Sequence, residues 1–556
     1  MLALEAGQFP NCDQLPGEGS ALLLDDPETL NHLAEACLGQ GELEQALSHY
    51  RRLVELCPQS AKVYTDLALT EERVGNLQAA AEAYRRALAL QPGSPDAHCK
   101  LAIVLRHLDG LPEALRLSER AVSLDPARFE TYNTLGVVLA DMHKWVAAAE
   151  AFRCSLALKP DSAQTAVDLG YFFVKCGDIP AAAESYRLAI KLDPHLHIAH
   201  LRLGTALTQL GDRTEAWKCY ERARALCPSS SEVITYMGLW HLAGGNFALG
   251  WGEYEYRESA RHARRKFSQP QWRGEPLQGA RIFLHADQGF GDALQCVRYV
   301  PLVAARGGEV ILGVQKRLHR LLARTEGAQH VIRTDETPPA FSWHCPLLSL
   351  PLAFATDLST IPARTPYVIP DPAHVEAWGQ RLRGNSLRIG LAWGGNPNYP
   401  HELWRSIPLE RLAPLTNLEG TTFYSLQMGA PARQVKQLGP RVHIINLQDE
   451  QKDFADTAAI VAHLDLVISI DTSVAHLAGA MGKPVWILLN NSPDWRWLLE
   501  REDSPWYPTA RLFRQSTFGN WQEVVARVER ELRRLATRTP ATRTEGDRLV
   551  VDIAKG

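Results

Sequence analysis

The sequence has no long apolar run and no large excess of charge of one sign. No stretch of about 18 consecutive apolar residues occurs in it, so we expect no membrane span. The formal net charge of −4 gives no electrostatic reason to expect nucleic acid or an anionic membrane as a partner. Residues 1–26 also lack the basic start and apolar stretch of a secretory signal. We therefore expect a cytoplasmic location.

Cysteine is present but is not arranged for cross-linking or for metal binding. The ten cysteines are scattered, and none stands in a Cys-x-x-Cys pair. This usage is typical of small buried side chains in a reducing compartment. We expect no metal site and no cofactor.

A repeat of 34 residues runs through the first half of the chain. It is marked by prolines at Pro58, Pro92, Pro126, Pro160, Pro194 and Pro228. Twelve residues before each proline stands an alanine: Ala46, Ala80, Ala114, Ala148, Ala182 and Ala216. An aromatic residue usually follows one helical turn later, and each unit opens with a large apolar residue followed by a small one. The pattern predicts paired helices that pack closely and that end at the proline.

This pattern resembles the tetratricopeptide repeat. The resemblance implies a helical solenoid over 27–262, after a leader at 1–26, with about seven units and a degenerate last one in which Gly250 replaces the alanine. Such an array holds a protein or peptide in its groove, or else acts as a spacer or a dimerisation surface. The predicted groove-facing residues are Asn31, Thr65, Cys99, Asn133, Val167, Leu201 and Thr235.

After about Arg264 the period disappears, and short apolar runs alternate with helical stretches. The runs predict strands at 282–285, 310–314, 389–393, 423–426, 442–445, 466–470 and 485–489. Such alternation predicts parallel sheets covered by helices. We expect a connector at 263–280, two Rossmann-like halves at 281–375 and 385–536, and a tail at 537–556. The expected fold class is a helical solenoid followed by a GT-B pair of α/β domains.

Three loops at predicted strand ends carry candidate functional residues. Asp292 follows Gly289 and Gly291 and begins a helix, where a carboxylate can cap the helix or take a proton. The second loop contains Asn396 and Arg405, and an arginine can form two parallel hydrogen bonds to a phosphate. The third, at 471–484, presents hydroxyls and free N–H groups at a helix start, which favours an anion.

Residues 280–536 resemble the heptosyltransferase-like family 9 glycosyltransferases that follow tetratricopeptide repeats in bacterial proteins. The resemblance rests on Gly291-Asp292, on Arg405-Ser-Ile-Pro408 and on Asp471-Thr-Ser-x-x-His476-Leu-x-x-x-x-Gly482-x-Pro484. It implies that Asp292 is the catalytic base. It also implies a donor site for a nucleotide sugar, in which the diphosphate lies near Arg405, Thr472 and Ser473. The nucleotide base would lie near Gln427. Asp471 would lie beside the sugar, and His476 would anchor the helix.

The resemblance implies an inverting, metal-independent glycosyltransferase whose repeats recruit a protein acceptor or a partner. One alternative is a non-catalytic scaffold whose glycosyltransferase-like half binds a nucleotide or supports the repeats. Another keeps the enzyme but makes the acceptor a glycan. The residues leave all three open.

Overall fold

The computed structural model describes residues 26–257, 267–382, 386–396 and 402–538. The chain forms two compact units, Met1–Ala199 and His200–Gly556, which we call unit 1 and unit 2. Their division falls within α12 (His197–Leu210), well before the predicted connector at 263–280. The predicted leader 1–26 and tail 537–556 lie almost entirely outside the described residues.

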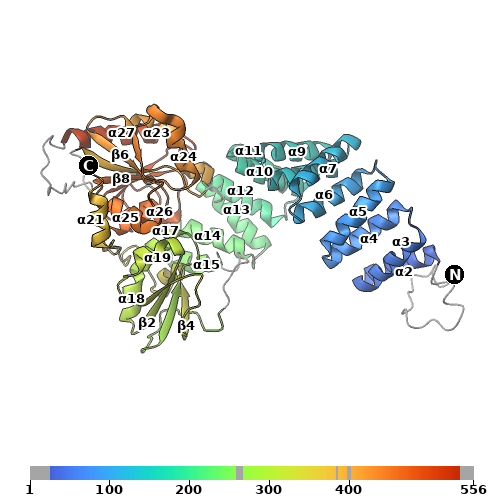
Figure 1. The fold of residues 1–556 in the computed structure, drawn as a ribbon, viewed down its shortest axis with the longest axis horizontal. Helices are drawn as coiled ribbons and strands as arrows, with labels where there is room; N and C mark the ends of the chain where they lie inside the picture. The colour runs from blue at the N-terminus through green and yellow to red at the C-terminus, as the bar shows by residue number, and fades with distance from the viewer. Residues whose placement is uncertain (1–25, 258–266, 383–385, 397–401, 539–556) are drawn as a thin grey trace. The chain divides into compact units, whose positions relative to one another are not determined.

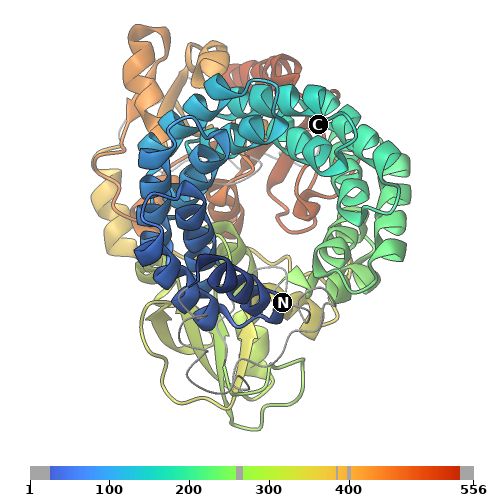
Figure 2. The same ribbon diagram turned by 90° about the vertical axis from the view of Figure 1, so that its right-hand side faces the viewer.

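The first part of the described chain is a series of antiparallel helix pairs, and Figure 2 shows the helices of unit 1 stacked in chain order along a curve. The fourteen helices are α2 (Pro27–Gln40), α3 (Leu43–Leu56), α4 (Ala61–Val74), α5 (Leu77–Leu90), α6 (Pro95–His107), α7 (Leu111–Leu124), α8 (Phe129–Asp141), α9 (Trp145–Leu158), α10 (Ala163–Cys176), α11 (Ile179–Leu192), α12, α13 (Arg213–Leu226), α14 (Ser231–Ala243) and α15 (Phe247–Tyr254). Among the described residues, no helix combines the length and the apolar character needed to cross a membrane.

The structure confirms the packing that the 34-residue period predicts. Each of the six repeated alanines is fully buried, and each repeated proline lies two residues beyond the end of a helix. The small residue at the start of a unit makes room for an aromatic ring of the second helix. A Cβ atom on Gly170 would lie 2.5 Å from the ring of Tyr186, for example.

The turn inside each helix pair carries a further repeat of the same period. Seven positions spaced by one period have positive φ, and five of them are glycine: Gly41, Gly75, Asp109, His143, Gly177, Gly211 and Gly245. Glycine adopts this left-handed conformation without steric cost and so ends the first helix of the pair. Asp109 and His143 adopt the same backbone conformation, with φ of 57° and 58°. The turn geometry therefore persists where glycine does not.

The predicted groove-facing set is wrong at three positions. Cys99, Val167 and Leu201 are buried, with exposed fractions of 6%, 5% and 0%. These side chains are apolar, and packing between helices removes them from water, which is favourable. The polar members of the set remain partly exposed: Asn31, Thr65, Asn133 and Thr235.

The first sheet contains four parallel strands in the order β3-β2-β1-β4. Its strands are β1 (Arg281–His285), β2 (Glu309–Val314), β3 (Ala328–Arg333) and β4 (Trp343–Pro346). Its helical segments are α17 (Phe290–Cys296), η2 (Val297–Tyr299), α18 (Val300–Ala305), α19 (Lys316–Leu322), η3 (Leu347–Ser349) and α20 (Leu350–Ala353). β1 is central and almost wholly buried, so the loop that follows it opens from the middle of the sheet.

The second sheet contains six parallel strands in the order β10-β9-β8-β5-β6-β7. Its strands are β5 (Leu387–Ala392), β6 (Thr421–Ser425), β7 (Ile444–Asn446), β8 (Leu466–Ile470), β9 (Val485–Leu489) and β10 (Ala510–Arg514). Its helical segments are α21 (Pro372–Gly379), α22 (Glu402–Arg405), α23 (Leu409–Thr416), η4 (Ala430–Ala432), α24 (Arg433–Leu438), η5 (Gly439–Arg441), α25 (Phe454–Ala462), α26 (Ser473–Ala480), η6 (Trp495–Trp497) and α27 (Trp521–Arg538). The two-sheet α/β region agrees with the coarse prediction (Figure 1).

Both faces of the second sheet are buried, which explains why its central strands are continuously apolar. Along β9, Trp486 and Leu488 belong to a core with α23 and α27. The alternate residues Val485, Ile487 and Leu489 belong to a second core with α25 and α26. Side chains alternate between the two faces of a strand, so each face needs its own apolar set.

The last helix pair shares a core with the sheets and does not form a separate repeat domain. Leu242, Phe247, Trp251 and Tyr254 lie in the same apolar cluster as residues of both sheets. Trp251 donates its Nε1–H to the Thr356 carbonyl at 2.7 Å. Arg257, which follows α15, pairs with Asp287 in the loop after β1 at 3.3 Å. These buried contacts explain why the packing boundary precedes the end of the repeat pattern.

We expect a fragment of residues 194–556, which keeps α12–α15, to be more stable than one of residues 264–556. The shorter fragment loses Trp251 and Tyr254 and removes the Arg257 partner of Asp287. Breaking a buried ion pair in this way costs about 3–5 kcal/mol. Urea denaturation followed by tryptophan fluorescence measures the difference. Equal unfolding midpoints for the two fragments would show that α12–α15 do not stabilise the α/β region, and would favour the predicted domain boundary near residue 263.

Candidate active site

Asp292 lies in the first turn of α17, directly after the loop that follows β1. Its Oδ2 accepts the backbone N–H of Gly289 at 2.7 Å, which satisfies an N-terminal amide of the helix. Its Oδ1 accepts a hydrogen bond from Arg496 Nη2 in an ion pair. Burial raises the pKa of Asp292, although the neighbouring Arg496 opposes this shift. The side chain keeps 19% exposure.

Arg405 lies at the end of α22, in the loop after β5, and is held from two sides. Its Nε–H donates to Glu402 Oε2 at 2.8 Å, and its Nη1–H donates to the Asp471 carbonyl at 3.1 Å. Glu402 also accepts hydrogen bonds from the Gly395 amide and the Ser406 hydroxyl. Arg405 therefore links the end of β5 to the end of β8. Asn396 is exposed in the same loop, and residues 397–401 lie outside the described residues.

Asp471, Thr472 and Ser473 join β8 to α26, as the sequence predicts for a strand-to-helix loop. Thr472 is the N-cap of α26, and its Oγ1 accepts the Val474 N–H at 3.3 Å. Ser473 begins the helix and is partly exposed. Burial raises the pKa of Asp471 to about 6, with Asp494 adding to the shift and Arg405 opposing it. This edge offers hydroxyls and N–H groups beside a carboxyl group with a raised pKa.

His476 is buried within α26 and has a structural environment. Its Nδ1 lies 2.8 Å from the Tyr507 hydroxyl, and its ring stacks on Trp497 with centroids 5.2 Å apart. Burial and nearby arginines lower its pKa well below the usual value, so the ring is neutral. Its Nε2 lies 3.9 Å from Asp471 Oδ1. The ring thus fixes α26 beside the loop that begins at Asp471.

The two sheets meet where α17 packs against α26, and Figure 1 shows these helices side by side. A Cβ atom on Gly291 would lie 2.6 Å from His476 Cδ2, so the backbone of α17 touches the ring directly. Asp292 is the next residue. The contact brings the candidate base of the first sheet next to the Asp471–His476 segment of the second.

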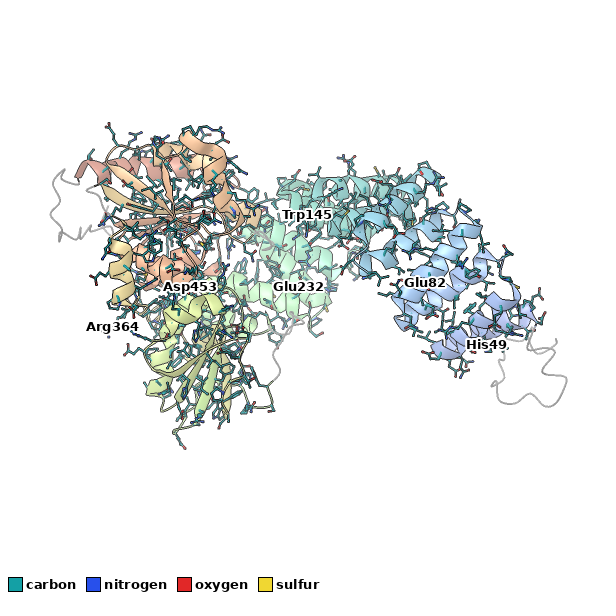
Figure 3. All side chains as sticks on the ribbon, in the orientation of Figure 1. His49, Glu82, Trp145, Glu232, Arg364 and Asp453 are labelled. Atoms are coloured by element: carbon teal, nitrogen blue, oxygen red, sulfur yellow. The ribbon has the colours of Figure 1, made fainter. Side chains whose placement is uncertain are left out.

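A second contact between the sheets involves charged residues on α19 and at the start of α25. Arg320 donates to both carboxylate oxygens of Asp453, at 2.7 and 3.0 Å, and approaches Asp456 at 2.9 Å. Asp453 is labelled in Figure 3. His374 of α21 also bonds Asp456, at 2.6 Å. Together with the α17–α26 contact, this cluster holds the two halves in one arrangement.

Gln427 is placed in the predicted loop cluster, but its amide is already used by backbone groups. Its Oε1 accepts the N–H groups of Trp393 and Gly394 at 2.9 and 2.8 Å. Its Nε2 donates to the carbonyls of Gly394 and Met428 at 2.8 and 3.1 Å. Only 4% of the residue is exposed. Its visible role is to fix the turn after β5.

Sequence reasoning missed Arg496, the centre of η6. Its guanidinium bonds Asp292, Gln295 and Asp494, the last at 2.7 Å. The flanking Trp495 and Trp497 are 2% and 0% exposed, so both tryptophans pack in the core. The sequence offered one signal for this role, because Arg496 stands between two tryptophans. An arginine that is buried with such neighbours requires anionic or polar partners.

No group of three or more His, Cys, Asp or Glu side chains within the described ranges is arranged to hold a metal ion. The charged groups that meet at the strand ends are instead arginines and carboxylates. The arrangement can stabilise a phosphate through Arg405 and the start of α26, and it can take up a proton at Asp292.

Comparison with known proteins identifies the helical part. The tetratricopeptide repeat family matches residues 25–92 in one form and residues 65–129, 133–197 and 167–231 in another. The N-terminal region therefore consists of tetratricopeptide repeats, which support a role in protein interaction. Protein FlbA of Caulobacter vibrioides is 30% identical over 322 residues, covering 53% of this chain and 54% of FlbA. The chain thus spans about half the length of this curated relative.

Solved structures resemble parts of the chain. A PilF structure from Pseudomonas aeruginosa is 24% identical, with 38% of this chain and 96% of that chain covered and a TM-score of 0.34. A MamA structure is 24% identical, with coverage of 31% and 94% and a TM-score of 0.29. YrrB, described as a TPR protein with an unusual peptide-binding site, is 18% identical, with coverage of 34% and 98% and a TM-score of 0.30.

Replacing Gly291 with alanine is expected to destabilise unit 2 by about 1–3 kcal/mol, because the added methyl group must displace His476 or separate the helices. Urea denaturation measures the change. Gly252→Ala in α15 is a matched control, since no described atom outside its own helix lies within 4 Å of its added Cβ. That change is expected to stabilise the helix by about 0.5–1 kcal/mol. Unchanged stability in Gly291→Ala would show that the α17–α26 contact yields easily.

Proposed function

We propose that residues 281–375 and 385–536 form a GT-B glycosyltransferase that moves a sugar from a nucleotide-sugar donor to a hydroxyl of a protein or glycan acceptor. The repeats recruit the acceptor or a partner protein. One observation carries the proposal: Asp292 of the first sheet lies beside the α17–α26 contact, next to the segment of the second sheet that the family resemblance assigns to the donor. Ligands of open α/β sheets bind at such strand ends.

The proposed reaction is a single displacement that inverts the anomeric carbon. Asp292 accepts the proton of the acceptor hydroxyl while the oxygen of that hydroxyl forms a bond to the anomeric carbon. The bond from that carbon to the diphosphate oxygen breaks, and the electron pair leaves with the nucleoside diphosphate. Both oxygens of Asp292 already accept one hydrogen bond, but each carboxylate oxygen has two lone pairs, so an acceptor for the proton remains.

The leaving diphosphate gains negative charge as the bond breaks. Arg405 and the N-terminal end of α26, where the backbone N–H groups carry partial positive charge, supply fixed positive charge for it in this scheme. Asp471 lies at the same edge, where burial raises its pKa to about 6. Thr472 and Ser473 offer hydroxyls beside these N–H groups.

A non-catalytic scaffold is the second candidate, and a specific observation favours it. Arg405 is paired with Glu402 and Asp292 with Arg496, so the charged groups are stabilised inside the protein without a substrate. A thermal-shift screen against nucleoside diphosphates and nucleotide sugars tests donor binding first. A ligand at 100 times its dissociation constant adds about 2.7 kcal/mol of stability. Turnover then separates the two candidates.

Changing Arg405 to alanine is expected to weaken nucleoside diphosphate binding by about 1.5–3 kcal/mol, the scale of a hydrogen bond to a charged group. Isothermal titration calorimetry measures the change. Arg405→Lys is the matched control, because it keeps the positive charge and is expected to keep most of the affinity. Unchanged binding in Arg405→Ala would remove Arg405 from the donor site.

Changing Asp292 to asparagine is expected to lower turnover by about 10²–10⁴-fold, because the amide cannot take a proton. Donor affinity is expected to stay nearly constant. Release of the nucleoside diphosphate, from transfer or from slow donor hydrolysis, measures the rate. Asp357→Asn is the control, since Asp357 also caps backbone N–H groups but lies in another loop. Full turnover in Asp292→Asn would exclude Asp292 as the catalytic base. Absence of turnover in the unaltered protein would favour the non-catalytic scaffold.

A further inference from the structure

Arg496 is held on several sides at the centre of η6. Its Nη2 donates to Asp292 Oδ1, its Nε to Gln295 Oε1 and its Nη1 to Asp494 Oδ1. The residue is 5% exposed, and Gln295 is fully buried in α17. Such a fixed guanidinium fixes the orientation of the Asp292 carboxylate as well, since a charge-assisted hydrogen bond in a buried site is strong and directional.

The neighbouring Trp495 rests on the last helix of the repeat array. Its ring meets that of Trp251 edge to face, with centroids 5.1 Å apart and an interplanar angle of 90°. It also contacts the ring of Tyr254, with ring centroids 6.2 Å apart. The guanidinium of Arg496 lies 4.4 Å from the centre of the Trp495 ring. An unbroken series of contacts therefore runs from α15 through Trp495 and Arg496 to Asp292.

We propose that Arg496 is a positioning residue for the Asp292 carboxylate, and that α15 holds Arg496 in place through Trp495. The inference rests on the proposed function, in which Asp292 is the base. Its consequence is that the terminal repeat helix is a structural part of the catalytic centre. A change in α15 then alters the chemistry of a carboxylate on the first sheet.

The direction of the effect follows from the charges around Asp292. Arg496 is the cation that opposes the effect of burial on the Asp292 pKa, whereas Asp494 and Asp287 raise it further. Other titratable groups also face this region: Tyr254 from α15, Cys296 from α17, the neutral His476 from α26 and Asp471 at the end of β8. Removing or displacing the guanidinium therefore favours the protonated carboxyl group and raises its pKa.

The test follows the protonation of Asp292 directly in the full-length protein. Aspartate labelled with ¹³C at the carboxyl carbon is titrated by NMR, and the Asp292 signal is assigned by its loss in Asp292→Asn. In Arg496→Met the midpoint is expected to move to higher pH by at least about one unit, a tenfold change in the proton affinity. In Arg496→Lys the midpoint is expected to stay close to that of the unaltered protein, because the positive charge is kept. Trp251→Phe is expected to move the midpoint in the same direction by less.

Two variants serve as controls. Arg511→Met removes an ion pair with Glu531 of α27, and Trp217→Leu removes an aromatic contact with Trp240. Neither is expected to move the Asp292 midpoint. Should Arg496→Met not fold, Arg496→Gln gives the same comparison with a polar side chain.

Because the titration needs no substrate, it separates failure of this inference from failure of the proposed function. An unmoved midpoint in the Arg496 variants overturns the positioning role, even where the unaltered protein turns over a donor. An unmoved midpoint in Trp251→Phe alone overturns the coupling to α15. In an active protein, the acid limb of the kcat/KM profile is expected to move with the NMR midpoint.

Discussion

The contact between α17 and α26 is the constraint on which the candidate site depends. Gly291 has no side chain, so the backbone of α17 reaches the buried ring of His476. This contact fixes the end of β1 next to the end of β8, although the two strands belong to different sheets. Without it, Asp292 and the Asp471–Ser473 segment would be two unrelated helix starts. The chemistry proposed for the site requires the two to lie on opposite sides of the anomeric carbon of a bound sugar, because an inverting displacement brings the acceptor in opposite the leaving diphosphate.

The repeats could be predicted from the sequence because their packing is local. Successive units repeat a contact between a small residue and an aromatic ring one helix later, as at Gly136, Gly170 and Gly204, so the pattern recurs along the chain without any long-range pairing. The strands at the sheet centres were also predictable, since burial on both faces makes them continuously apolar. The strands that the sequence did not reveal are β3, β4 and β10, and all three are edge strands. An edge strand needs fewer apolar residues, as the partly exposed side chains of β3 illustrate.

The site was predictable only as far as strand ends identify loops. The rule that ligands bind at the carboxyl ends of strands led to Asp292, Arg405 and Asp471, which the structure places in neighbouring loops of unit 2. The rule does not say which other residues these side chains contact. Arg496 is 204 residues from Asp292 in the chain, and Gln427 contacts backbone groups 33 residues away. Such pairings depend on how two sheets meet, which residue spacing in one sequence does not reveal.

The domain boundary shows the same limit from the other direction. Sequence pattern divides the chain where the repeat ends, but packing divides it at Ala199, before three further helices, α13–α15, and most of α12. The reason is that Trp251, Tyr254 and Arg257 bury their side chains against loops of the α/β region, and these loops lead into Asp292 and Arg496. A repeat unit normally contacts only its neighbouring repeats. Here the neighbour of the last unit is the candidate catalytic region itself, so the end of the solenoid has lost its repeat pattern while keeping its helices.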